Sequence, residues 1–147
     1  MNTEKRLLEN ENEPSCLGAV SGSVILPTHL RIGNLVIRND VVYEVWDLKR
    51  KELELDSQKL DRHVMYCTYD ELYPIPISEK LLLELGAIDL NYKNYPSYNL
   101  KGLQVNFVNG MWIEYVSRVE LYGLHWLQNI FFFRMNEELC VSALTDR

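Results

Sequence analysis

The sequence has no surplus of basic residues. Fifteen Lys and Arg stand against 21 Asp and Glu, which gives a formal net charge of −6. Proteins that hold nucleic acid through its phosphates need a basic surface, so the charge disfavours binding to nucleic acid and to anionic membranes. Residues 64–90 form the most acidic stretch, with five acidic residues against Lys80.

Cysteine is also scarce. The chain holds only Cys16, Cys67 and Cys140, and no two of them form a Cys-x-x-Cys pair. An odd number of widely spaced cysteines is typical of reduced thiols in the cytoplasm. No apolar run approaches the roughly 18 residues of a membrane span, and residues 1–13 lack the apolar core of a signal peptide. We therefore expect a cytoplasmic protein without a membrane segment.

Catalytic and metal-binding signatures are missing as well. The chain has no Gly-x-Ser-x-Gly, phosphate-loop, dinucleotide-binding or His-Glu-x-x-His motif. His29, His63 and His125 do not stand at metal-ligand spacing from one another or from the cysteines, so we expect no metal and no cofactor. Neighbouring carboxylates such as Glu137 and Glu138 are interpreted as solvated surface charge. We expect no enzymatic activity, with an enzyme whose site is assembled from distant residues as an alternative.

Apolar residues, in contrast, make up 47% of the chain, and their spacing predicts an α+β fold. Residues 1–29 are expected to form a polar tail and an extended strap, and residues 30–147 a single α+β domain. Strand patterns over residues 32–69, with a turn at Asn39-Asp40, predict an N-terminal antiparallel β-unit. A small SH3-like barrel is one form that this unit can take.

A short helix and a β-hairpin follow in the sequence. Ser78 offers its hydroxyl as an N-cap, and Gly86 can end the helix in the left-handed conformation. Asn109-Gly110 lies between two β-rich runs, which is the strongest two-residue hairpin signal. Residues 89–100 are predicted to be a loop with aromatic anchors, and residues 139–144 a closing strand.

The last long element is predicted to be a buried helix packed on the sheet, over residues 123–135. Leu124, Leu127 and Phe131 share one face of it, and Phe133 is expected to broaden that face. A run of three phenylalanines would also suit a strand, so the pattern alone leaves this alternative open.

The opposite side of this helix carries a polar stripe of His125, Gln128 and Asn129. One interpretation is a contact with a partner, in which case Trp112 and Tyr122 are candidate neighbours. The other is that these side chains satisfy backbone groups inside the domain, as buried polar groups must. We favour the second interpretation.

Aromatic residues are numerous, with three tryptophans and nine tyrosines. Tyr and Trp are enriched at the energetic centres of protein interfaces. Tyr92, Tyr95 and Tyr98 in the predicted loop are therefore the best candidates for an aromatic binding surface. The alternative is that these rings belong to the core.

Three motifs occur in order along residues 30–140: LRIGNLV (30–36), YPIPISE (73–79), and LHWLQNIFF (124–132) followed by EEL (137–139). The chain resembles a family of small proteins found in phages and mobile elements of gut bacteria, whose members carry LRIGN, PIPLTEE and VHQLQNLYF…GEEL. It departs from that pattern at Trp126, where a polar residue is usual, and at residues 134–136, where Leu-Thr-Gly is common.

The resemblance implies a phage or prophage setting, but no activity, ligand or catalytic residue. Such a setting favours a protein partner, which is a host factor, a phage factor or a second copy of the chain. We therefore expect a non-enzymatic protein-binding accessory or regulatory module. The alternatives are a nucleic-acid-binding small-barrel protein and an enzyme with a site that sequence does not show.

Overall fold

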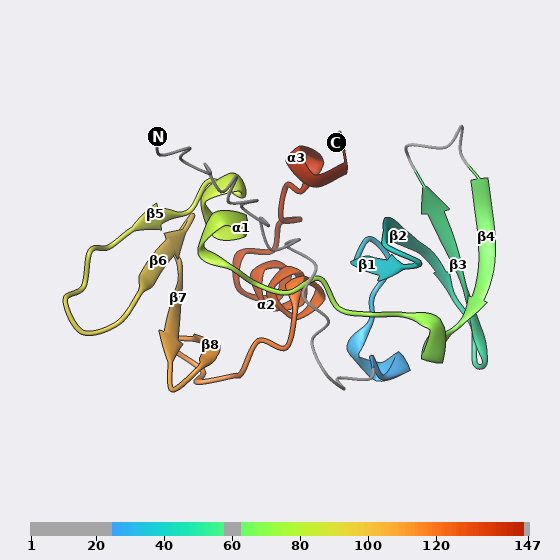
Figure 1. Cartoon of the computed structure of the whole chain (residues 1–147). Helices are drawn as coiled ribbons and strands as arrows, with labels where there is room; N and C mark the ends of the chain where they lie inside the picture. The colour runs from blue at the N-terminus through green and yellow to red at the C-terminus, as the bar shows by residue number, and fades with distance from the viewer. Residues whose placement is uncertain (1–24, 58–62, 146–147) are drawn as a thin grey trace, which may run out of the picture.

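Two four-stranded antiparallel sheets flank the helices of the computed structural model, which describes residues 25–57 and 63–145 (Figure 1). In each sheet the strand order follows the sequence. The arrangement confirms the predicted α+β class. Sheet A consists of β1 (Leu35–Arg38), β2 (Val41–Leu48), β3 (Glu52–Ser57) and β4 (His63–Thr68), and sheet B of β5 (Ile88–Asp89), β6 (Ser97–Leu100), β7 (Leu103–Val108) and β8 (Met111–Glu114).

The longest helix, α2, lies between the two sheets (Figure 1). The predicted closing strand over residues 139–144 is wrong, because the chain forms a helical turn there, although Leu139 is buried. The helices are η1 (Pro27–His29), η2 (Tyr69–Glu71), α1 (Glu79–Glu84), α2 (Leu124–Met135) and α3 (Ser142–Thr145).

Two-residue turns set the register of the hairpins. Asn39 and Asp40 join β1 to β2 with φ of 49° and 60°, and Asn109 and Gly110 join β7 to β8 with φ of 52° and 82°. Positive φ at both central residues is the type I′ geometry, whose twist matches that of the flanking strands. Both predicted turns are confirmed.

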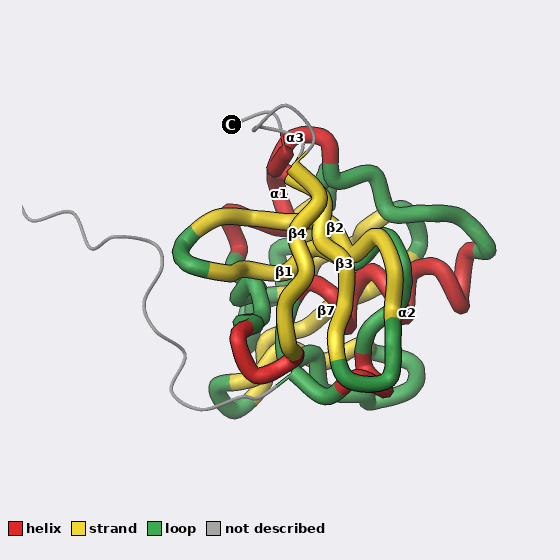
Figure 2. The backbone as a smooth tube through the Cα atoms, turned by 90° about the vertical axis from the view of Figure 1, so that its right-hand side faces the viewer, coloured by secondary structure: helices red, strands yellow, loops and turns green. Residues whose placement is uncertain are grey.

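Strand β1 is buried on both of its faces. Leu35 faces the cluster formed with α1, α2 and sheet B, whereas Val36 faces a second cluster inside sheet A. The outer edge of β1 is bridged by Tyr73, and Arg38 forms an ion pair of 2.7 Å with Glu71. Sheet A, which faces the viewer in Figure 2, thus curls around its own core. That core contains Ile25, Leu30, Val36, Tyr43, Val45, Leu53, Leu55, Cys67 and Leu72.

The short helix α1 has the predicted ends. The Ser78 hydroxyl accepts a hydrogen bond of 3.1 Å from the Leu81 amide, which satisfies one of the free amides of the first turn. Gly86 follows the helix with φ of 86°, the left-handed conformation that stops a helix without a steric cost. Leu81 and Leu82 pack into the cluster below sheet B.

The predicted loop over residues 89–100 is wrong in its last part, because Ser97–Leu100 form strand β6. Tyr98 pairs with Val105 and Leu100 with Leu103, so two side chains point inward and are buried. Asn91, Asn94 and Pro96 lie before this strand, whereas Asn99 lies within it. The tyrosine at position 98 is a core residue, and the strand alternation explains why.

The C-terminal end of α2 differs from the expectation in one residue. Phe133 is 84% exposed and does not broaden the apolar face, because it lies about 200° around the helix from the buried Phe131. The helix ends at Asn136 with φ of 55°. Asn tolerates this left-handed conformation almost as glycine does, so Asn136 can replace the glycine that the resembled family has here.

Replacing Gly110 tests the hairpin turn. Gly110→Val should lower the free energy of unfolding by about 1 kcal/mol or more, because a β-branched side chain disfavours positive φ. Urea denaturation measures the change, with Lys80→Ala on the exposed side of α1 as a control that should shift stability by less than about 0.5 kcal/mol. Equal stabilities of Gly110→Val and the wild type would contradict the turn geometry.

Candidate functional site

Gln128, the centre of the polar stripe, bonds to the backbone on both sides of Asn34. Its side chain is 2% exposed. The Oε1 atom accepts a hydrogen bond of 2.9 Å from the Leu35 amide, and Nε2 donates one of 3.0 Å to the Gly33 carbonyl. One carboxamide therefore replaces a strand partner for the start of β1, which supports the structural interpretation of Gln128.

Asn129 holds the same N-terminal segment from the next position of α2. Its Nδ2 donates to the His29 carbonyl at 2.8 Å, and its Oδ1 accepts from Asn34 Nδ2 at 2.9 Å and from Arg31 Nε at 3.3 Å. Asn34 is itself fully buried, and its Oδ1 accepts from the Arg31 amide. Asn129 thus belongs to an internal network with three partners.

Arg31 extends this network to the segment after α2. Its guanidinium forms a two-pronged contact with Glu138, at 2.6 and 2.9 Å, and lies 4.3 Å from the centre of the Phe132 ring. The hydrogen bond from Arg31 holds the pKa of Glu138 below its usual range. The LRIGNLV segment (30–36) is therefore joined to the EEL segment (137–139) by an ion pair.

The middle motif meets α2 at its N-terminus. The Ile75 carbonyl accepts a hydrogen bond of 2.8 Å from the Leu124 amide. A side chain at Gly123 would place its Cβ 2.7 Å from Pro74 Cβ, so only glycine allows this close approach. The first two motifs therefore both contact α2, which carries the third.

His125 is buried beside Gly123, and its ring lies near Trp126. Among the described residues its Nδ1 atom has no hydrogen-bond partner. Burial, and secondarily the neighbouring His29, lower the pKa of His125 from 6.5 to about 4. The imidazole is therefore neutral near pH 7, and its burial leaves no surface that a partner can reach.

The two aromatic neighbours proposed for the stripe lie in different places. Trp112, in β8, is half-buried on the inner face of sheet B. Its ring centre lies 4.9 Å from that of Phe107 and 6.0 Å from that of Tyr98. Tyr122 is exposed and touches Trp126 edge-on at 5.9 Å. The structure does not assemble His125, Trp112 and Tyr122 into one exposed face.

Glu114 is a buried carboxylate at the end of β8. It accepts hydrogen bonds from the Val116 amide at 3.0 Å and the Ser117 amide at 2.6 Å, and Arg134 lies 3.5 Å away. Burial by itself would raise the pKa of Glu114, but these contacts hold it below its usual range. The carboxylate stabilises the turn after β8, so its burial has a structural cause.

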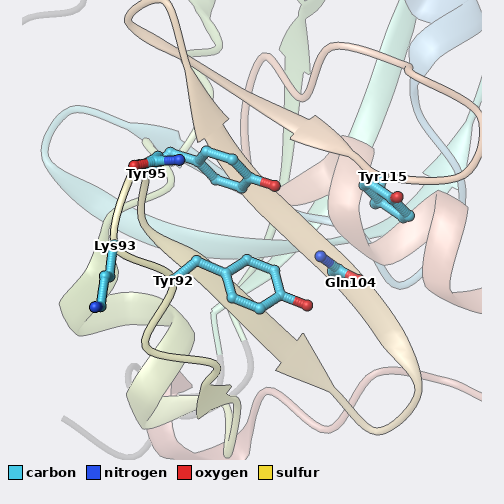
Figure 3. A pocket seen from close by; sticks show the side chains of 6 residues that line it. Tyr92, Lys93, Tyr95, Gln104 and Tyr115 are labelled. Carbon is cyan, nitrogen blue, oxygen red and sulfur yellow. The ribbon is translucent and has the colours of Figure 1, made fainter.

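The tyrosine segment between β5 and β6 does form an open hollow. Figure 3 shows the rings of Tyr92 and Tyr95 one above the other, with their hydroxyls directed toward the side of Gln104 and Tyr115. The two rings contact each other edge-on, with centres 5.8 Å apart, and Tyr92 is 50% exposed. We call this site the tyrosine groove. It has a volume of about 330 Å³ and is lined by Tyr92, Lys93, Asn94, Tyr95, Gln104 and Tyr115.

The floor of the tyrosine groove is a polar network on the outer face of sheet B. The Ser97 hydroxyl donates to Asn106 Oδ1 at 2.6 Å. Gln104 Nε2 donates to Ser97 Oγ and to Asn106 Oδ1, each at 3.1 Å. Ser97 and Asn106 are buried. A floor held by its own hydrogen bonds keeps Gln104 in a fixed position at the base of the groove.

A second hollow, of about 410 Å³, adjoins the first and shares residues 92–95 with it. Glu79 and Asp89 lie in its wall together with the ring of Tyr98. Asp89 Oδ1 accepts a hydrogen bond of 2.7 Å from the Asn91 amide, which orders the start of the segment. Two carboxylates thus line the hollow that shares residues 92–95 with the tyrosine groove.

Comparison of the sequence and structure with known proteins found no match. No family model, curated protein or solved structure matches the chain. Within residues 25–57 and 63–145 there is no group of three or more His, Cys, Asp or Glu that could hold a metal ion. None of the helices in this part of the chain is long and apolar enough to cross a membrane.

Sequence reasoning identified Tyr92 and Tyr95 but missed Gln104 and Tyr115. The alternation of β7 gives a signal for Gln104, because Leu103 and Val105 on either side of it are apolar and face inward. Nothing local marks Tyr115, which reaches the groove only because β8 folds back beside β7.

Removing the Gln128 carboxamide tests its structural role. Gln128→Ala should lower the free energy of unfolding by about 1–3 kcal/mol, because the Leu35 amide and the Gly33 carbonyl lose their partner. Phe133→Ala, at the exposed position of the same helix, should change it by less than about 0.5 kcal/mol. A Gln128→Ala variant as stable as Phe133→Ala in urea would contradict the structural interpretation.

The buried imidazole predicts acid sensitivity. Because the folded-state pKa of His125 lies near 4, below the unfolded value of 6.5, the unfolded chain binds the proton more tightly. The contribution of the neutral His125 to the free energy of unfolding is therefore fully present above pH 6.5. It falls as the pH drops toward 4, by roughly 2.5 kcal/mol at pH 4.5. In His125→Gln the loss between pH 7 and 4.5, measured by urea denaturation, should be roughly 2 kcal/mol smaller. An unchanged loss would refute this assignment.

Proposed function

We propose that the protein is a non-enzymatic, cytoplasmic binding module that recognises another protein through the tyrosine groove. The observation that carries the proposal is the edge-on pair formed by the exposed Tyr92 ring and the half-buried Tyr95 ring, beside the polar network that holds Gln104. Tyrosine offers a large amphipathic contact area and loses little side-chain entropy on binding. A rigid arrangement of such rings suits a protein interface.

The composition of the segment supports the same proposal. Residues 90–96, between the two strands, contain two asparagines and two tyrosines, and these residue types are enriched in the binding loops of antibodies. Gln104 of β7 adds an amide, and Tyr115, in the turn after β8, adds a further ring. The resemblance to phage and mobile-element proteins supports a host or phage factor as the partner, with self-association as the alternative.

Nucleic acid is a weaker proposal. The exposed rings Trp46 and Tyr66 lie on sheet A, near the basic turn that starts at Lys49. However, Glu54 lies directly opposite Tyr66 in the sheet, and Asp56 follows on the same face. Phosphates would meet these carboxylates, so this face does not suit a polyanion.

Affinity capture tests the proposed function. The tagged full chain is incubated with lysate of gut bacteria, and bound proteins are identified by mass spectrometry for the wild type, the Tyr92→Ala/Tyr95→Ala variant and Tyr66→Ala. Tyr66 is 58% exposed on the other sheet, so it is a matched control. We expect proteins that the wild type and Tyr66→Ala retain and the double variant loses by at least about tenfold.

Two results would contradict the proposal. One is a set of captured proteins that the double variant retains in full. The other is a set that only Tyr66→Ala loses, which would place the binding face on sheet A. Melting temperatures of the three proteins show whether each variant is folded, and the exposure of Tyr92 and Tyr66 predicts little change in either.

A further inference from the structure

We infer that the occupant of the tyrosine groove is an extended, proline-containing segment of the partner that carries a Lys or Arg beside its prolines. The inference rests on the proposed function and names the chemistry of the partner. Three features of the groove support it: the arrangement of the rings, the hydrogen-bond donors around them and the carboxylates at the adjoining hollow.

The rings suit proline. Tyr92 and Tyr95 meet edge-on at 5.8 Å, and the two hollows on either side of their segment are open to solvent rather than enclosed. An open, aromatic-lined groove is the surface on which polyproline II segments dock, since they are already extended and lose little entropy on binding. An enclosed cavity would instead suit a compact small molecule.

The groove also supplies donors. A polyproline II segment makes no internal hydrogen bonds, so its carbonyl oxygens need donors from the receptor. The hydroxyls of Tyr92 and Tyr95 point the same way, toward Gln104 and Tyr115 (Figure 3). The phenol groups can each donate to a carbonyl, whereas Gln104 Nε2 already donates to Ser97 and Asn106.

The adjoining hollow sets the charge of the ligand. Glu79 and Asp89 lie in its wall, within the stretch of residues 64–90 that is the most acidic of the chain. Lys93 is the one basic residue that lines the two hollows, and in Figure 3 its side chain points away from the tyrosine hydroxyls. A Lys or Arg next to the prolines therefore complements the two carboxylates.

Labelled peptides test the inference. Fluorescence anisotropy measures the affinity of the full chain for short peptides of repeated Pro-Pro-Arg, Gly-Gly-Arg and Pro-Pro-Glu. The first should bind at least about tenfold more tightly than either of the others, because only it combines the preformed extended backbone with positive charge. Tyr92→Ala/Tyr95→Ala should weaken its binding by about tenfold or more, Glu79→Gln by about threefold, and Tyr66→Ala not at all.

The outcomes separate this inference from the proposed function. If captured proteins depend on the groove but Pro-Pro-Arg binds no better than the other peptides, the proposed function holds and the assigned ligand class is wrong. If Pro-Pro-Arg binds the double variant as well as the wild type, the peptide is attracted by net charge alone and the inference fails. If Gly-Gly-Arg binds as tightly as Pro-Pro-Arg, proline has no role in recognition. If Pro-Pro-Glu binds as tightly as Pro-Pro-Arg, the two carboxylates have none.

Discussion

The carboxamide of Gln128 is the contact on which the two halves of this fold depend. It satisfies the Leu35 amide and the Gly33 carbonyl from within α2, in a region where both backbone groups are shielded from water. Because β1 is buried on both faces, fixing its start also fixes the relative position of the two hydrophobic clusters. Asn129, Asn34 and Arg31 surround this contact with further hydrogen bonds.

This arrangement separates structural from binding residues. The Gln128 and Asn129 side chains of α2 face the N-terminal segment and are hydrogen-bonded to it, whereas the tyrosine groove lies on the outer face of sheet B, away from that contact. Its floor belongs to the sheet, and its rings come from the connection between β5 and β6. The fold can therefore hold the groove rigidly while the sequence of the connecting segment sets what it binds.

Local signals predicted much of the fold because their causes are local. Asn39-Asp40 and Asn109-Gly110 adopt the turns that their φ preferences require, and Ser78 caps its helix. The error at Tyr98 has a non-local cause, because its pairing with Val105 draws it into a strand. In the site, Tyr92 and Tyr95 were recognisable by type. Their neighbours are Gln104 in β7 and Tyr115 directly after β8, which only the folded sheet brings near them.

Hydrogen exchange tests most directly whether the Gln128 contact makes the two sheets one cooperative unit. Native-state exchange is measured for the slowest amides of β2 and β3 in sheet A and of β7 in sheet B. If the contact couples the clusters, these amides exchange only through global unfolding, and their free energies of opening agree within about 0.5 kcal/mol. Sheet A opening at a free energy more than about 1 kcal/mol below that of sheet B would show that the halves unfold independently, and would contradict the account.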